Sequence, residues 1–214
     1  MTVSAELRMS LESLELFTEL VRSQRDEPEV EFERLLDGYL ETRRSLAKQF
    51  SLVAQRHLLR GETLLETTRA RIEERMAKLF GSRIPEKYLV VHGYKSVQPV
   101  LLQYLAQHVG NPVRSSKLRV LTADQIHTER RVRDLRDLGF DVEWKKVADE
   151  DQYVLRSVEP DLDAAVALQV RKNIKDDKKL AKHDKEKLLS IAEETPGKTS
   201  SESRILTSPS PHNE

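Results

Sequence analysis

The stretch from residue 97 to residue 156 most constrains the fold, because glycine-marked breaks divide it into helical and strand-like segments. Val100, Leu101 and Leu105 recur at helical spacing ahead of a break at residues 110–112, Gly-Asn-Pro. After Gly139, residues 140–144 alternate apolar and polar, as in a half-buried strand. This order predicts helices followed by a small sheet.

Two more helices fit between these breaks. Ser115 or Ser116 can cap a short helix that carries Leu118 and Leu121, and residues 122–128 then form a turn. Thr128 is a good N-cap for a third helix over residues 129–138, which Gly139 ends. The sequence therefore predicts three helices in a row.

The third helix divides into an apolar and a charged side. At about 100° per residue, Val132 and Leu135 point together toward a core, with Leu138 at the edge of that side. The opposite side carries a charged set, and Arg131 lies at its flank: Glu129, Arg130, Arg133, Arg136 and Asp137. Because arginine presents a planar donor fork that fits guanine edges and phosphate oxygens, this side is typical of a DNA reader.

A hairpin follows the third helix. Lys145 and Lys146 continue the strand that begins at Phe140, residues 148–151 turn, and residues 153–155 return. Three helices and then a hairpin predict a winged helix-turn-helix domain over residues 83–160. We expect the two lysines of the wing to lie over the sugar-phosphate backbone.

The flanking regions are helical and highly charged. Residues 1–82 predict three amphipathic helices (4–24, 28–60 and a third ending at Gly81), either a self-contained bundle or a coiled-coil-like region for dimerisation or partner docking. Residues 161–194 predict one charged helix, capped by Asp161 or Asp163. Residues 195–214 are rich in serine, threonine and proline and are expected to be disordered. The expected fold class is mainly α with a small β wing.

The overall composition restricts the possible classes of protein but does not indicate a function. Lysine plus arginine and aspartate plus glutamate both number 36, so any nucleic-acid surface must come from local segregation of charge. The chain has no cysteine and no apolar run of about 18 residues, so we expect a cytoplasmic protein without a membrane contact. No metal or cofactor is expected.

Two segments carry a family resemblance: LLQYLAQHVGNPVRSSKL (101–118) and TERRVRDLRDLGFDVE (128–143). They resemble the winged helix that precedes the HNH nuclease domain in some bacterial restriction and defence proteins. The resemblance implies that the third helix contacts duplex DNA, with Arg130 and Arg133 reading bases and Thr128 and Arg131 contacting the backbone. Beyond residue 160 the only histidines are His183 and His212, so the nuclease half is expected to be absent.

The leading hypothesis is a non-enzymatic protein that reads duplex DNA, as a regulator or as the recognition component of a restriction or defence system. The expected DNA-binding residues are Arg114, Ser116, Lys117, Thr128, Arg130, Arg131, Arg133, Arg136, Lys145 and Lys146. One alternative is a restriction-type endonuclease or a fragment of one, using the E-x-K motif at residues 143–145 with Asp124 or Asp134. Another is a helical adaptor whose winged helix binds protein. In a further interpretation the charged side of the third helix is only a solvated face, with its arginines paired to Asp134 and Asp137.

Overall fold

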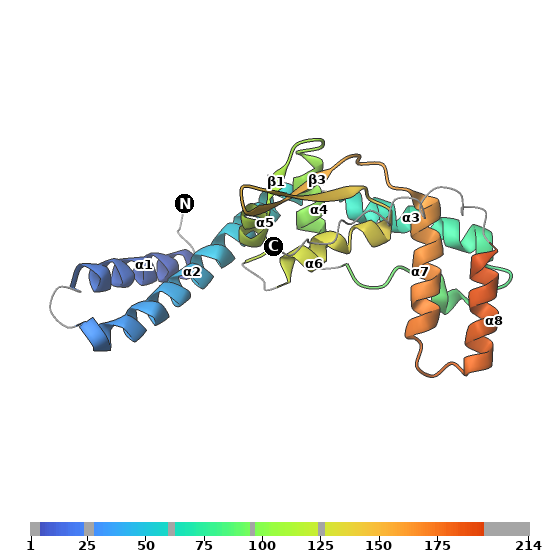
Figure 1. Cartoon of the computed structure of the whole chain (residues 1–214), viewed down its shortest axis with the longest axis horizontal. Helices are drawn as coiled ribbons and strands as arrows, with labels where there is room; N and C mark the ends of the chain where they lie inside the picture. The colour runs from blue at the N-terminus through green and yellow to red at the C-terminus, as the bar shows by residue number, and fades with distance from the viewer. Residues whose placement is uncertain (1–4, 24–27, 60–62, 95–96, 124–126, 195–214) are drawn as a thin grey trace, which may run out of the picture. The chain divides into compact units, whose positions relative to one another are not determined.

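The structure is a computed structural model that describes residues 5–23, 28–59, 63–94, 97–123 and 127–194. The expected tail at 195–214 and Asp124 lie outside the described residues. The described part contains eight α-helices and one three-stranded antiparallel sheet, which confirms the mainly helical fold class with a small β wing (Figure 1). None of the described helices is long and apolar enough to cross a membrane.

The chain forms two compact units. The first contains residues 1–67, 94–136 and 140–158, and the second contains residues 68–93, 137–139 and 159–214. The chain therefore passes from one unit to the other several times.

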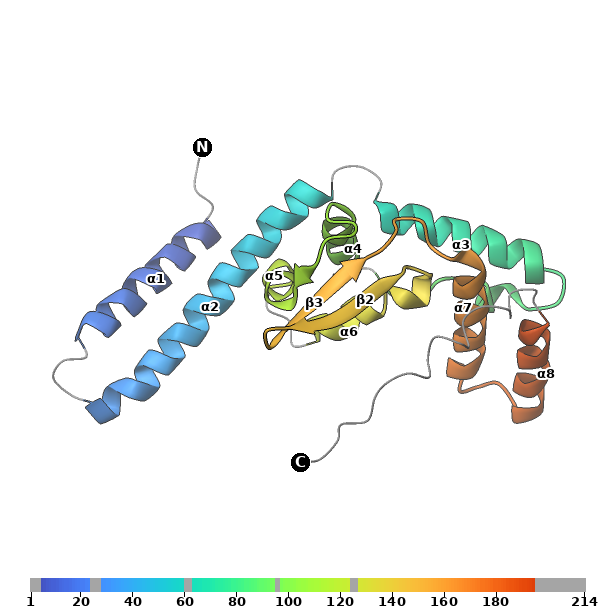
Figure 2. The same cartoon turned by 45° about the horizontal axis from the view of Figure 1, so that its top comes forward.

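Two long helices lead into the first unit. α1 (Ala5–Ser23) and α2 (Pro28–Leu58) match the first two helices expected from the sequence. They lie side by side, and the rings of Phe17 and Tyr39 meet with their centroids 6.1 Å apart (Figures 1 and 2). α3 (Leu64–Phe80), the third expected helix, belongs to the second unit. The first unit thus contains a two-helix arm, α1 and α2.

The rest of the first unit is a winged helix-turn-helix. Its elements are α4 (Gln98–Ala106), β1 (Val113–Arg114), α5 (Ser115–Leu121), α6 (Thr128–Arg133), β2 (Val142–Val147) and β3 (Glu150–Leu155). The strand order is β1-β3-β2 and both pairings are antiparallel, so β2 lies at an edge (Figure 2). The sequence analysis missed β1, which is only two residues long.

The core of this domain is formed by aliphatic side chains from every element. Leu101, Leu105, Leu118, Leu135 and Leu155 are fully buried. Burying each such side chain stabilises the fold by roughly 1.5–3 kcal/mol before the entropy cost of ordering it. This core fixes α4, α5 and α6 against the sheet.

A tight turn closes the wing. Ala148 and Asp149 both have positive φ angles, 48° and 62°. Two consecutive residues of that kind are typical of a type I′ turn, whose twist matches that of the flanking strands. The turn expected over residues 148–151 is therefore shorter, and β3 already begins at Glu150.

The third helix of the domain is shorter than expected. α6 ends at Arg133, and a separate 3-10 turn covers Arg136–Leu138 in place of one continuous helix. Gly139, with a φ of +84°, follows this 3-10 turn and not the α-helix that the sequence predicts to end there. The N-cap is His127 rather than Thr128. Thr128 is instead buried, and its hydroxyl shares a 2.7 Å hydrogen bond with that of Thr122.

The second unit is built from α3, the short turn Glu86–Tyr88, α7 (Leu162–Asp176) and α8 (Lys182–Glu193). The single helix expected over 161–194 is thus two helices. Asp161 caps α7 as expected, because its carboxylate accepts a 3.0 Å hydrogen bond from the Ala164 amide. Where α7 ends, Asp177 accepts hydrogen bonds from the Lys87 ammonium at 2.9 Å and the Tyr88 hydroxyl at 2.8 Å. These bonds hold the pKa of Asp177 well below its usual range.

Replacing Gly139 by alanine tests the close packing inside the second unit. A Cβ at this position would lie 2.2 Å from the Asp161 carbonyl oxygen, and the φ of +84° adds backbone strain. Gly93→Ala is the matched control, since its φ is +83° but nothing lies within 4 Å of the added carbon. We expect Gly93→Ala to cost about 1–2 kcal/mol and Gly139→Ala clearly more in urea unfolding. Equal losses would contradict the close approach.

Candidate nucleic-acid interface

The two sides of α6 differ as the sequence predicts. Val132 and Leu135 are fully buried, whereas the side chains of Arg130 and Arg133 are exposed. Within the described part of the chain, neither guanidinium group forms a hydrogen bond or an ion pair. These two arginines therefore present their donors to solvent on the side opposite the core.

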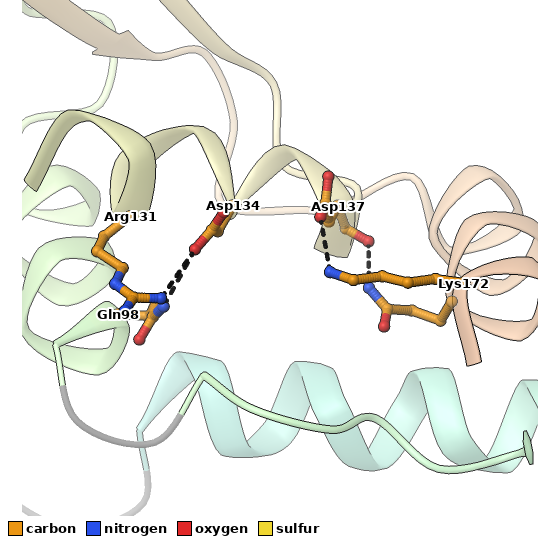
Figure 3. Close-up of polar contacts among 6 residues, drawn as sticks. Gln98, Arg131, Asp134, Asp137 and Lys172 are labelled. Carbon is orange, nitrogen blue, oxygen red and sulfur yellow. Dashed lines mark hydrogen bonds and ion pairs between the residues drawn. The ribbon is translucent and has the colours of Figure 1, made fainter. Parts of the chain in front are cut away.

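Arg131 and Arg136 hold the domain together instead. Arg131 pairs with Asp134 at 3.5 Å, and Asp134 also accepts a 3.4 Å hydrogen bond from Gln98 of α4 (Figure 3). The Nε of Arg136 donates to the Val142 carbonyl at 2.6 Å, where β2 begins. Both side chains are exposed, so their outer nitrogen atoms still face solvent.

Asp137 has its partners in the second unit. Its carboxylate pairs with the Lys172 ammonium at 3.2 Å, and its backbone carbonyl accepts a 2.9 Å hydrogen bond from Gln169 (Figure 3). One alternative was that the arginines of the helix pair with Asp134 and Asp137. Among the described ion pairs, Arg131 pairs with Asp134, whereas Asp137 pairs with Lys172.

A contact that the sequence analysis missed orders the start of α6. Arg119 of α5 donates from Nε to the Glu129 carboxylate at 2.6 Å. Burial opposes ionisation of Glu129, but the hydrogen bond of its own backbone amide, the Arg119 contact and the positive charge of Arg133 together lower its pKa. The Glu129 carboxylate is therefore bound by Arg119 and forms no ion pair with Arg130.

The residues at the start of α5 meet the wing at Glu150. Arg114 pairs with Glu150 at 3.3 Å, and the Ser116 hydroxyl donates to the same carboxylate at 2.5 Å. Lys117 is exposed, and its ammonium has no hydrogen bond or ion pair with any described residue. Arg114 and Ser116 thus join α5 to the wing, and Lys117 faces solvent.

The register of the wing separates its two lysines. Trp144 lies opposite Tyr153, and Lys146 lies opposite Asp151, so these four side chains share one face. Lys145 lies opposite Gln152 and points to the other face. Both lysines are exposed, and Lys146 pairs with Asp149 at 3.2 Å.

Tyr153, which shares a face of the hairpin with Trp144, lies close to α6. Burial raises the pKa of Tyr153, the negative charges of Glu129 and Asp151 raise it further, and the positive charges of Arg133 and Arg136 oppose the shift. Tyr153 therefore lies near both positive and negative side chains, among them Arg133 of α6 and Arg136 of the turn after it. The alternation of residues 140–144 predicts that Trp144 points inward with Phe140 and Val142, but its side chain is 54% exposed.

The E-x-K motif at residues 143–145 has a structural explanation. Glu143 pairs with Arg156 across the wing, and Asp134 is bound by Arg131 and Gln98. Among the described residues there is no group of three or more histidine, cysteine, aspartate or glutamate side chains placed to hold a metal ion.

The fold and this surface define a winged helix-turn-helix domain of the kind that places an arginine-bearing helix beside a wing. A family model described as the KpnI N-terminal domain matches residues 98–156, from α4 to the end of the wing. This region is thus related to the N-terminal domain of the restriction endonuclease KpnI, an HNH-family enzyme, as the resemblance implied. The match covers less than half of the chain. No curated protein and no solved structure matches.

The pair of Arg119 and Glu129 predicts a defined pH dependence of stability. Because the folded state lowers the pKa of Glu129, its carboxylate contributes stability above its ordinary pKa, and this contribution is lost as pH falls through the lowered value. We expect Glu129→Gln to lose less stability than the wild type between about pH 5 and pH 3, measured by urea unfolding at each pH.

Asp149→Asn is the control for this comparison, because the Asp149 side chain is 99% exposed. It should follow the wild type through the same pH range. Identical pH profiles for Glu129→Gln and the wild type would contradict a structural role for the pair.

Proposed function

We propose that this protein binds duplex DNA without cutting it, as the recognition component of a restriction or defence system or as a regulator. The observation that carries the proposal is the pair of exposed guanidinium groups, Arg130 and Arg133, on a helix whose opposite side is fully buried. In winged and other helix-turn-helix domains such a helix enters the major groove. The relation of residues 98–156 to a restriction endonuclease domain supports the same function.

The proposed roles follow from how each side chain is held. Arg130 and Arg133 have no partner among the described residues, so their planar forks are available for bidentate contacts with guanine. Arg131, Lys117 and Lys146 are exposed at the flanks, where phosphate contacts set the register without reading sequence. Thr128 is buried and is not part of the proposed surface.

The double variant Arg130→Ala with Arg133→Ala tests this proposal. A preferred duplex is first selected from a random pool with the wild-type protein, and affinity is then measured by fluorescence anisotropy of the labelled duplex. Each lost base contact should cost about 1–3 kcal/mol, and wild-type affinity should fall steeply with salt. Lys178→Ala with Lys179→Ala removes the same charge from exposed positions of the second unit and should bind almost as the wild type does. No wild-type binding at low salt, or equal binding by both double variants, would contradict the proposal.

We also propose that the arm of α1 and α2 joins two copies of the chain, since two half-sites bound together add their binding energies. Large apolar side chains remain uncovered along it: Leu16 is 61% exposed, Phe50 61% and Val53 62%. Next to Phe50, a groove of about 640 Å³ extends between α1, α2 and α5. An apolar surface of this kind on a soluble unit is typical of a protein contact.

Phe50→Asp with Val53→Asp should convert a dimer into a monomer, because a buried unpaired carboxylate opposes association. Multi-angle light scattering of the full chain at several concentrations measures the mass directly. Leu168→Asp, at an apolar position of α7 that is 38% exposed, is the control and should leave the mass unchanged. A wild-type chain that is monomeric at every concentration would overturn the proposed arm contact.

A further inference from the structure

Trp144 is the one tryptophan of the chain, and it lies in an unusual place for a large aromatic side chain. It is 54% exposed, although the alternation of its strand should direct it inward. Its cross-strand neighbour Tyr153 is only 3% exposed. Since β2 is an edge strand, the indole lies beyond the part of the sheet that α6 covers.

The face around Trp144 changes from apolar to charged along β2. Val142, two residues before it, is 3% exposed, and Lys146, two residues after it, is exposed. Arg136 donates to the Val142 carbonyl, so this arginine lies where the same strand begins. The indole is thus placed between the arginines of α6 and the tip of the wing.

Charge at the wing itself is balanced by ion pairs. Glu143 pairs with Arg156, Glu150 with Arg114, and Asp149 with Lys146. Lys146 is paired with an aspartate that is itself open to solvent, so the pair reduces, but does not remove, the positive charge that Lys146 offers to a phosphate. The exposed indole of Trp144 distinguishes the wing from α6, whose exposed side carries arginines.

We propose that Trp144 is a DNA-contacting residue, whose indole packs against deoxyribose and base edges next to the bases held by α6. This inference rests on the proposed DNA-binding function. Duplex DNA is the occupant because Arg136 lies at the start of the same strand and the neighbouring α6 exposes Arg130 and Arg133, which favours a polyanion over a neutral partner. Apolar side chains contact duplex DNA through sugar and base surfaces, and such a contact neutralises no phosphate and so releases no counterion.

The intrinsic fluorescence of the full chain tests the inference, because every photon of tryptophan emission comes from position 144. Adding an unlabelled duplex should quench or shift this emission at the same concentrations at which a labelled duplex gains anisotropy. Trp144→Ala should weaken duplex binding on the order of tenfold and leave the slope of affinity against salt unchanged, since no phosphate contact is lost. Trp144→Phe should retain most of the affinity.

Val147→Ala is the matched control, because Val147 is 45% exposed on the other face of the same strand and should bind as the wild type does. If the wild-type chain does not raise the anisotropy of a labelled duplex at low salt, the proposed function itself fails. If it does, but the emission is unchanged and Trp144→Phe and Trp144→Ala bind equally well, only the contact of Trp144 is overturned. Should Trp144→Ala fail to fold, the emission of the wild type and the affinity of Trp144→Phe decide.

Discussion

Burial of Val132 and Leu135 is the constraint on which the account of α6 depends. Val132 of α6 and Leu135 in the turn directly after it are both fully buried, so the rotation of the helix about its axis is fixed. Because helical residues at other positions point elsewhere, Arg130 and Arg133 are directed away from the core. A polar substitution at Val132 or Leu135 would therefore disturb the surface as well as the stability of the domain.

Ion pairs and hydrogen bonds determine which charged side chains around α6 remain available to a ligand. Glu129 is held by Arg119, Asp134 by Arg131 and Gln98, and Asp137 by Lys172. Each of these three carboxylates thus has a hydrogen-bond or ion-pair partner other than Arg130 or Arg133. A chain whose charges balance overall can in this way present a local cationic surface. The relation to a restriction endonuclease domain covers the same residues, 98–156.

Periodicity predicted most of the fold, since α1, α2, the three helices of the winged domain and the hairpin all follow from apolar spacing. It could not predict β1, a two-residue strand that exists only through its pairing with β3. The exposure of Trp144 was also missed, because alternation gives the face of a strand but not how far a helix covers it. Arg119 and Glu129 are ten residues apart and meet only through the packing of α5 on α6. Residue types in the sequence thus predicted where the candidate DNA-binding surface lies. Which of its arginines are free of ion pairs depends on tertiary contacts that the sequence does not reveal.

The most direct test of the central claim is an NMR titration of the isotope-labelled full chain with a duplex selected by the protein itself. The account predicts that shift changes concentrate in residues 128–133 and 142–147, α6 and β2, including the indole signal of Trp144 and the side-chain signals of Arg130 and Arg133. Changes confined to α3, α7 and α8, or a spectrum unaltered by saturating duplex at low salt, would contradict it.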